Sequence, residues 1–259
     1  MNAFLSVEAL SVRFGGLLAI ESLSFELREG EVLSLIGPNG AGKTTAFNAI
    51  TGYLAPASGE IRFRGRRLNG LSTNRVAELG LVRTFQKTSV FGGRSALENI
   101  LIGLHLRSKQ SALAILLGLP SVAREEKELE AEARRVLDFV GLGARADEAG
   151  AALPYGEQRL LEVAIALAAK PKLLMLDEPV SGMNPSETAS FMAKLAEIRG
   201  LGITVLLVEH DMKMVMGVSD RIVCLSQGRI IANGTPAQIQ SDPEVIRAYL
   251  GERYARAHG

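Results

Sequence analysis

The sequence predicts an α/β fold with a mainly parallel sheet flanked by helices, an N-terminal antiparallel β portion and a helical lobe. Three observations lead to this prediction. Apolar runs of strand character alternate with helical patterns, which favours a parallel sheet covered on both faces. The earliest runs instead follow one another across glycine turns, which favours antiparallel pairing. Residues from Ala96 to about Val140 have a helical pattern and predict a lobe of their own.

The N-terminal part of the chain is rich in strand patterns. Gly15-Gly16 and Glu29-Gly30 are typical of turns between strands. A helix is expected over residues 42–51, because a glycine and then a proline follow it. Residues 60–94 return to strands and loops. The expected strands of this part are Phe4–Ala9, Ser22–Leu27, the wholly buried Val32–Ile36 and the alternating Ile61–Arg64.

The rest of the chain alternates between helices and strands. Residues 123–140 and Glu157–Ala169 repeat apolar positions at helical spacing. Two buried strands, Lys172–Leu176 and Ile203–Val208, enclose a helix near Pro185–Arg199. The expected elements of the tail are strands at Arg221–Leu225 and Ile230–Ala232, then short helices after Thr235-Pro236 and after Asp242-Pro243.

Composition limits the classes of partner. Lys and Arg total 29 against 28 Asp and Glu, whereas a protein whose main task is to grip nucleic acid usually has a basic excess. The single cysteine, Cys224, fits a reducing compartment and a small buried side chain. No signal peptide is visible, and Ala112–Leu119 is far shorter than the roughly 20 residues of a membrane-spanning helix. We expect a soluble protein that has no nucleic acid partner. If the protein works at a membrane, we expect a partner protein to hold it there.

The strongest motif follows the strand Val32–Ile36. Two glycines bracket four residues, and Lys and Thr come next, which is the pattern of the P-loop NTPase core. Glycines let backbone amides approach phosphate oxygens, and the following helix points its positive end at them. Lys43 can reach the outer phosphates of ATP, and Thr44 can place a hydroxyl on Mg²⁺. The predicted phosphate-binding residues are Gly37, Pro38, Asn39, Gly40, Ala41, Gly42, Lys43, Thr44 and Thr45.

Carboxylates follow the second buried strand of the predicted sheet. Ligands bind at the carboxyl ends of parallel strands, so Asp177 is predicted to hold Mg²⁺, directly or through water. Glu178 is predicted to orient or deprotonate the attacking water. The next strand ends at Glu209-His210, where His210 could sense the terminal phosphate. Without further context, an ordinary surface histidine is the alternative.

In this order the motifs resemble those of the ATP-binding-cassette (ABC) transporter ATPases over nearly the whole chain. Phe14 resembles the adenine-stacking position of that family, and His210 resembles its switch histidine. Gln86 resembles the glutamine that contacts Mg²⁺ and the attacking water and senses the membrane partner. Leu153–Arg159 resembles the family signature, and Ser181–Pro185 the loop that crosses between subunits. The resemblance implies catalytic roles for Glu178, His210 and Gln86, and metal ligands in Thr44, Gln86 and Asp177.

The resemblance also implies a head-to-tail dimer, in which each ATP lies between the phosphate loop of one subunit and the signature of the other. Tyr155, Gly156 and Glu157 are then expected to contact nucleotide. The signature departs from the family pattern, because Pro154 aligns with the usual Ser and Tyr155 with the following Gly. Since Pro154 has no N–H to donate, contact would come from backbone amides such as that of Gly156. In the crossing loop, Asn184 stands where Asp is more common.

These departures narrow the resemblance to the ATPases of branched-chain amino acid importers. The Leu-Pro-Tyr-Gly signature, the Arg83–Gln86 stretch, the helical insertion at about Leu104–Ala123 and the Ala248–Gly251 ending are similar to that group. The resemblance implies ATP hydrolysis that drives import of branched-chain amino acids or related small polar solutes. The implied partners are transmembrane permease subunits, an identical or paralogous second ATPase and, indirectly, a solute-binding protein. The implied location is peripheral, on the cytoplasmic face of the membrane.

Other functions stay open at this point. They are an ATPase of a urea or amide importer, an ATPase of a lipopolysaccharide exporter, a non-transport ABC ATPase of DNA repair or ribosomes, and a P-loop kinase. Non-transport relatives usually carry a long coiled-coil insertion or a second cassette, and a kinase would not explain Gln86, the signature and His210 in one order. We expect one ABC ATPase domain over residues 1–259: a nucleotide-binding core in 1–94 and 154–240, a helical lobe in 95–153 and a helical tail in 241–259.

Overall fold

The structure of the protein is a computed structural model that describes residues 3–84, 90–105 and 120–249. The chain divides into two compact units. The first unit comprises residues 1–83, 172–179 and 192–259, and the second comprises residues 84–171 and 180–191. The lobes expected from the sequence stay a prediction.

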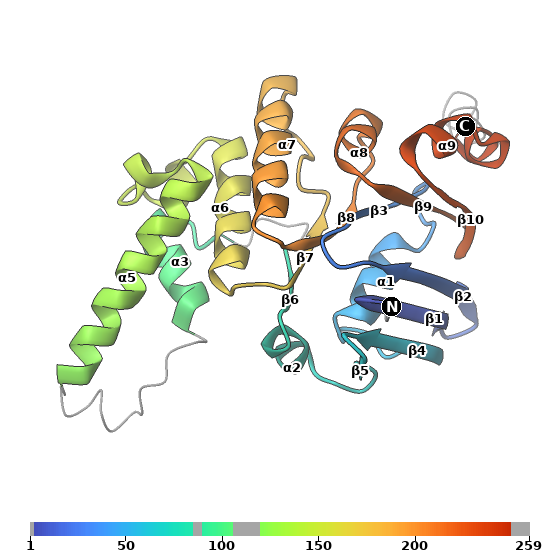
Figure 1. Ribbon diagram of the computed structural model, residues 1–259, viewed down its shortest axis with the longest axis horizontal. Coiled ribbons are helices and arrows are strands. Elements are labelled where there is room, and N and C mark those ends of the chain that lie inside the picture. Colours follow the sequence, from blue (N-terminus) through green and yellow to red (C-terminus); the bar gives the residue numbers. More distant parts are fainter. Residues whose placement is uncertain (1–2, 85–89, 106–119, 250–259) are drawn as a thin grey trace. The chain divides into compact units, whose positions relative to one another are not determined.

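Two sheets form the first unit (Figure 1). The smaller sheet is antiparallel, with the strand order β2 (Leu17–Leu27), β1 (Leu5–Phe14), β4 (Ser58–Phe63) and β5 (Arg66–Arg67). The larger sheet has the order β10 (Arg229–Gly234), β9 (Arg221–Ser226), β3 (Val32–Ile36), β8 (Thr204–Val208), β7 (Leu173–Asp177) and β6 (Leu81–Arg83). Its strands are parallel except for β10, which pairs antiparallel with β9.

Apolar layers cover both faces of the larger sheet. On one face, Phe47 and Ile50 of α1 (Lys43–Ile50) share a buried cluster with residues of both sheets. On the other face, α8 (Met212–Val218) and α9 (Pro236–Ser241) pack on β9. Every residue of β3, β7 and β8 is buried, because these strands lie inside the sheet with both faces covered. Cys224 is buried in β9, and burial raises the pKa of its thiol to about 12.

The second unit is helical. Figure 1 shows α3 (Ala96–His105), α5 (Pro120–Val140) and α6 (Tyr155–Ala168) side by side, and all three pack on one another. The 3₁₀ turns η1 (Gly143–Arg145) and η2 (Gly150–Ala152) link α5 to α6. The helix α7 (Pro185–Gly200) begins in this unit and ends in the first.

The predicted fold class is confirmed, and three details of the prediction are wrong. Strands β1 and β2 are longer than expected, since they pair with each other almost to the Gly15-Gly16 turn. The helix α2 (Thr73–Glu78) lies in a stretch predicted to hold only strands and loops, and its single buried residue, Val76, gives no helical period. The helix α8 was not predicted, because it is too short to repeat its apolar face. None of the described helices is both long and apolar enough to span a membrane.

Candidate functional site

The predicted phosphate loop runs from the end of β3 to the start of α1. Gly37 has a φ of +149°, and a Cβ atom there would lie 2.1 Å from the carbonyl oxygen of Leu225 in β9. Gly42 has a φ of +103°, and its Cβ atom would lie 3.0 Å from the carbonyl oxygen of Ala19 in β2. Both positions require glycine, because the main chain of the loop passes directly against two neighbouring strands.

The start of α1 is suited to bind an anion. Gly42 is its N-cap, and the first turn, which lies wholly within the described residues, has no acidic side chain and no side-chain cap. The amides of this turn and the helix dipole therefore present positive charge to the loop. The ammonium of Lys43 adds a full charge and donates hydrogen bonds to the carbonyl oxygens of Gly37 and Pro38, at 2.6 and 3.0 Å. Among the other predicted loop residues, Ala41 is buried, Thr45 is half-buried, and Asn39, Gly40 and Thr44 are exposed.

Asp177, the predicted metal ligand, is the last residue of β7, and its side chain is only 1% exposed. Its Oδ2 atom accepts a hydrogen bond of 2.6 Å from the Nη2 atom of Arg83, the last residue of β6. Burial raises the pKa of Asp177, and the nearby charge of Glu178 raises it further, whereas Arg83 and Lys43 lower it. The role of Arg83 in the site was not predicted, because the pairing of β6 with β7 cannot be read from the sequence.

Glu178, the predicted catalytic carboxylate, has an unusual backbone conformation. Its φ is +48°, in the left-handed region, which costs a non-glycine residue on the order of 1–3 kcal/mol. Its N–H group donates a hydrogen bond of 2.8 Å to the carbonyl oxygen of Val208, the last residue of β8. This bond between neighbouring strand ends holds the strained residue in place. Backbone strain of this kind is typical of active sites.

His210 follows β8 and has an exposed side chain. Its backbone is held by the buried carboxylate of Glu209, whose Oε2 atom accepts hydrogen bonds from the N–H groups of His210 and Asp211, at 2.8 and 3.1 Å. The Nδ1 atom of His210 lies 3.6 Å from the same oxygen. Glu209 therefore fixes the turn that presents the imidazole. This role of Glu209 was not predicted, because the sequence does not distinguish a buried Glu from an exposed one beside a strand end.

The sheet brings most of the predicted catalytic residues to one edge. Lys43 and His210 follow β3 and β8, and Asp177 is the last residue of β7; these strands are parallel and adjacent in the order β3-β8-β7. Phe14 is the half-exposed last residue of β1, on the hairpin whose other strand, β2, contacts Gly42. Gln86 lies outside the described residues.

The signature-like segment lies in the second unit, at the start of α6. Pro154 is the N-cap, and Tyr155 is the first helical residue. The hydroxyl of Tyr155 donates a 2.9 Å hydrogen bond to the carbonyl oxygen of Ser181 and accepts a 3.1 Å bond from Nε of Arg159. The guanidinium of Arg159 also lies 5.3 Å from the centre of the Tyr155 ring. Glu157 forms a 2.8 Å ion pair with Arg145.

The crossing-loop residue Asn184 caps α7. Its Oδ1 atom accepts hydrogen bonds from the N–H groups of Ser186 and Glu187, at 2.9 and 3.0 Å, and its own N–H donates to Oε2 of Glu187 at 2.8 Å. Glu187 also packs on the signature, because a Cβ atom at Gly156 would lie 2.8 Å from its Oε1 atom. An Asn oxygen accepts the same amides as an Asp carboxylate, which explains why Asn is tolerated here.

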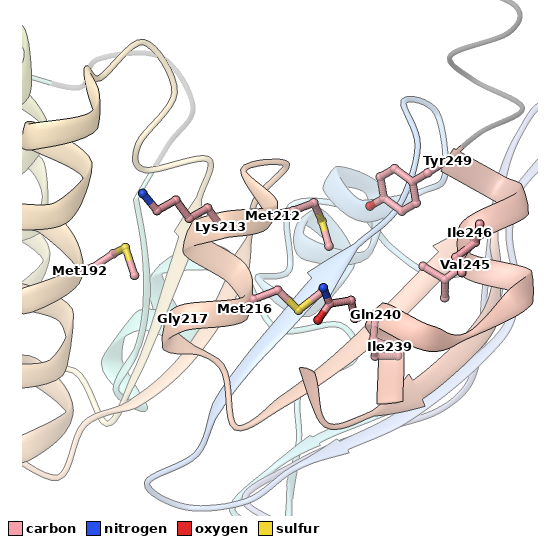
Figure 2. Close-up of a pocket in the computed structure, with 10 residues that line it drawn as sticks. All are labelled: Met192, Met212, Lys213, Met216, Gly217, Ile239, Gln240, Val245, Ile246 and Tyr249. Atoms are coloured by element: carbon pink, nitrogen blue, oxygen red, sulfur yellow. The ribbon is translucent and has the colours of Figure 1, made fainter. Parts of the chain in front are cut away.

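A separate cavity of about 760 Å³ lies on the other face of the large sheet, between α8 and the C-terminal helices (Figure 2). Its walls are mainly apolar and rich in methionine. The lining residues are Met192, Met212, Lys213, Met216, Gly217, Ile239, Gln240, Val245, Ile246 and Tyr249. None of them is a carboxylate or belongs to the phosphate loop, so this cavity lacks the groups that ATP chemistry requires.

Two family models match parts of this chain. A model described as ABC transporter matches residues 20–181, which include the phosphate loop, Asp177 and Glu178. A second model, described as branched-chain amino acid ATP-binding cassette transporter, matches residues 229–255.

Known proteins similar to this chain carry related descriptions. The high-affinity branched-chain amino acid transport ATP-binding protein LivG of Salmonella typhimurium is 47% identical over 249 residues, which cover 96% of this chain and 98% of LivG. The corresponding protein BraF of Pseudomonas aeruginosa is 45% identical with the same coverage. The solved ADP conformation of an ATP-binding cassette of an ABC transporter is 31% identical, with a TM-score of 0.85 over 97% of this chain and all of that one.

Proposed function

Since the chain belongs to the ABC transporter ATPases, within the family of branched-chain amino acid transport ATP-binding proteins, we propose that it powers import of branched-chain amino acids. It is an ATP-binding subunit that couples ATP hydrolysis to transport. The cargo is supported by the descriptions of LivG and BraF, and by the match of the second family model near the C-terminus.

One observation carries the catalytic part of this proposal. The glycine loop follows β3, and Asp177 and Glu178 stand at the end of β7, so that all of them lie at the carboxyl ends of parallel strands in one sheet. Gly37–Thr45 would bind the phosphates through main-chain amides and Lys43. Glu178 would orient or deprotonate the attacking water, and His210 would contact the terminal phosphate.

The residues at this edge fit a magnesium ion. Thr44 offers a hydroxyl on the exposed side of the first turn of α1, and Asp177 offers a carboxylate. Among the described residues, His, Cys, Asp and Glu form no group of three that could hold a metal alone. One carboxylate and one hydroxyl suit Mg²⁺, which is usually held by one or two carboxylates together with substrate phosphates and water. When bound, the ion would offset negative charge on the phosphates. Gln86, the third predicted ligand, lies outside the described residues.

The complete site would include a second ATPase subunit. Phe14 would stack on the adenine, and Tyr155, Gly156 and Glu157 would contact the ATP bound by the partner's phosphate loop. The exposed ring of Tyr155 and the start of α6, where Gly156 offers backbone amides, support this part of the proposal. The assembly would lie on the cytoplasmic face of the membrane, where permease subunits hold it and a solute-binding protein delivers cargo.

The catalytic role of Glu178 has a direct test. Glu178→Gln removes the basic oxygen but keeps the shape of the side chain, so ATPase turnover should fall about a hundred- to ten-thousandfold. ATP affinity, measured by calorimetry, should stay near that of the parent, and gel filtration with ATP should show a dimer. Glu244→Gln is the matched control, since it makes the same change on an exposed surface. Parental turnover in Glu178→Gln would refute this role.

The cargo needs a transport assay. The ATPase should be reconstituted in liposomes together with its permease subunits and solute-binding protein. Leucine, isoleucine or valine should be taken up when ATP is enclosed on the ATPase side. Uptake of urea or amides alone would replace the proposed cargo but leave the ATPase assignment intact.

A further inference from the structure

Arg83 connects the phosphate-loop helix to the end of β7. Its side chain is only 7% exposed. Its Nη2 atom donates to Oδ2 of Asp177 and its Nη1 atom to Oδ1 of Asn48 in α1, both at 2.6 Å. The guanidinium also lies 5.4 Å from the centre of the Phe47 ring, one residue earlier in α1. One planar group therefore touches both elements that carry the proposed metal ligands.

A buried pair of this kind needs an explanation beyond stability. Removing an Arg and an Asp from water costs several kcal/mol for each ion, and apolar replacements of such pairs are often as stable. The other four residues of β7, Leu173–Leu176, are apolar and buried. The bonds of Arg83 are short, charged and directional, so they fix the orientation of the Asp177 carboxylate.

We propose that Arg83 is a positioning residue for the metal site: its hydrogen bond to Oδ2 fixes the orientation of the Asp177 carboxylate that would hold the ion. This inference rests on the proposed function, in which Asp177 holds Mg²⁺. Through Asn48, Arg83 also ties that carboxylate to α1, the helix that carries Thr44. Groups that orient metal ligands typically contribute 10- to 100-fold to metal affinity.

The geometry requires Arg and not merely a positive charge. Asp177 and Asn48 are bound by different nitrogens of one rigid fork, whose plane also faces Phe47. A lysine ammonium has one nitrogen on a flexible stem and cannot hold both oxygens in this arrangement. Arg83→Lys therefore keeps the charge beside Asp177 and removes only the orientation.

The test measures metal affinity directly. Mn²⁺ replaces Mg²⁺ as a probe, and electron paramagnetic resonance follows its binding to the protein–ADP complex. Arg83→Lys should weaken Mn²⁺ binding 10- to 100-fold. ADP affinity measured in EDTA should change less than about twofold, because the loop itself is intact. In ATPase assays, excess Mg²⁺ should restore the turnover of Arg83→Lys toward that of the parent, which loss of structure would not allow.

Arg221→Lys is the matched control. Arg221 also pairs with a buried carboxylate, since its Nε atom lies 2.8 Å from Oε1 of Glu31. Arg221 is the first residue of β9, and Glu31 directly precedes β3. The pair therefore lies at the amino ends of these parallel strands, whereas Asp177 lies at the carboxyl end of β7. Arg221→Lys should lower the melting temperature but leave Mn²⁺ affinity unchanged.

The outcomes separate this inference from the proposed function. If the parent protein shows no ADP-dependent Mn²⁺ binding, the metal part of the proposed function fails. If the parent binds Mn²⁺ and Arg83→Lys binds it equally well or more tightly, only the role of Arg83 is refuted. Equal losses in Arg83→Lys and Arg221→Lys would also refute it, because the effect would then be one of stability.

Discussion

The two segments proposed to contact ATP phosphates, the phosphate loop and the signature-like segment, are held in different ways. The loop is fixed by main-chain neighbours: Gly37 lies against the carbonyl of Leu225, and Gly42 against that of Ala19. The signature is fixed by side chains, chiefly the hydroxyl of Tyr155 and the carboxylate of Glu187. A main-chain neighbour cannot change by mutation, whereas a side chain can.

This difference accounts for where the sequence departs from its family pattern. The loop matches the pattern at every glycine, because a Cβ atom at Gly37 or Gly42 would meet backbone of another strand. The signature has Tyr155 where Gly is usual, and the added hydroxyl bonds to Ser181 in the crossing loop. A segment held by side chains tolerates such a change, because the side chains around it can rearrange.

Gly37→Ala should have the largest effect of the substitutions that probe this comparison. A methyl group would lie 2.1 Å from the Leu225 oxygen at a φ of +149°, and relief requires movement of β9. We expect about 3 kcal/mol or more of lost stability and no measurable ATP binding. Chemical denaturation and ATP titration by calorimetry check both.

Gly65→Ala is the control for Gly37→Ala. Gly65 also has a positive φ, of +78°, but a Cβ atom there meets nothing within 4 Å. Gly65→Ala should lower the stability only by the cost of the left-handed conformation, about 1 kcal/mol, and should leave ATP binding unchanged. Equal losses in the two variants would mean that conformation, and not the strand beside the loop, fixes Gly37.

Gly156→Ala should have a smaller effect of a different kind. The new methyl group would lie 2.8 Å from Oε1 of Glu187, a side-chain end that can move only by weakening its bond to the N–H of Asn184. We expect about 1–2 kcal/mol of lost stability. ATP affinity should be kept, because the phosphate loop is untouched, while ATPase turnover falls.

A double variant sharpens this prediction. Adding Glu187→Ala makes room for the methyl group, so the double variant should lose less stability than the sum of the two single variants. Strict additivity would show that Glu187 does not restrain the signature. If Gly156→Ala lost ATP affinity, the signature would affect ATP binding by the phosphate loop, contrary to this prediction.

The parts of the site that could be predicted from the sequence are those fixed by local chemistry. The phosphate loop can be recognised in the sequence because its glycines, its lysine and the start of its helix follow one another directly. The bond between Arg83 and Asp177 joins residues 94 positions apart, and it depends on the register of β6 against β7, which no local pattern reveals. Glu209 is adjacent to His210, yet its role depends on burial that only the assembled sheet creates.

Tyr155→Phe should have the smallest effect and is the most specific probe of the side-chain contacts. It removes one hydroxyl, with its bonds to the Ser181 carbonyl and to Nε of Arg159, and keeps the ring beneath the guanidinium. The half-exposed Ser181 carbonyl can bond to water instead, and Arg159 keeps its 3.0 Å ion pair with Glu162. The loss of stability should therefore be about 1 kcal/mol, measured by denaturation, with ATP affinity unchanged.

The matched control for this hydroxyl is Tyr53→Phe. Tyr53 is 68% exposed, so any bond of its hydroxyl competes with water and should contribute less than about 0.5 kcal/mol. If Tyr155→Phe costs no more than Tyr53→Phe, the bond to the crossing loop does not stabilise the signature. The departure to tyrosine would then need a contact outside this chain. If Tyr155→Phe costs more, the Tyr155 side chain stabilises the signature, whereas main-chain contacts stabilise the phosphate loop.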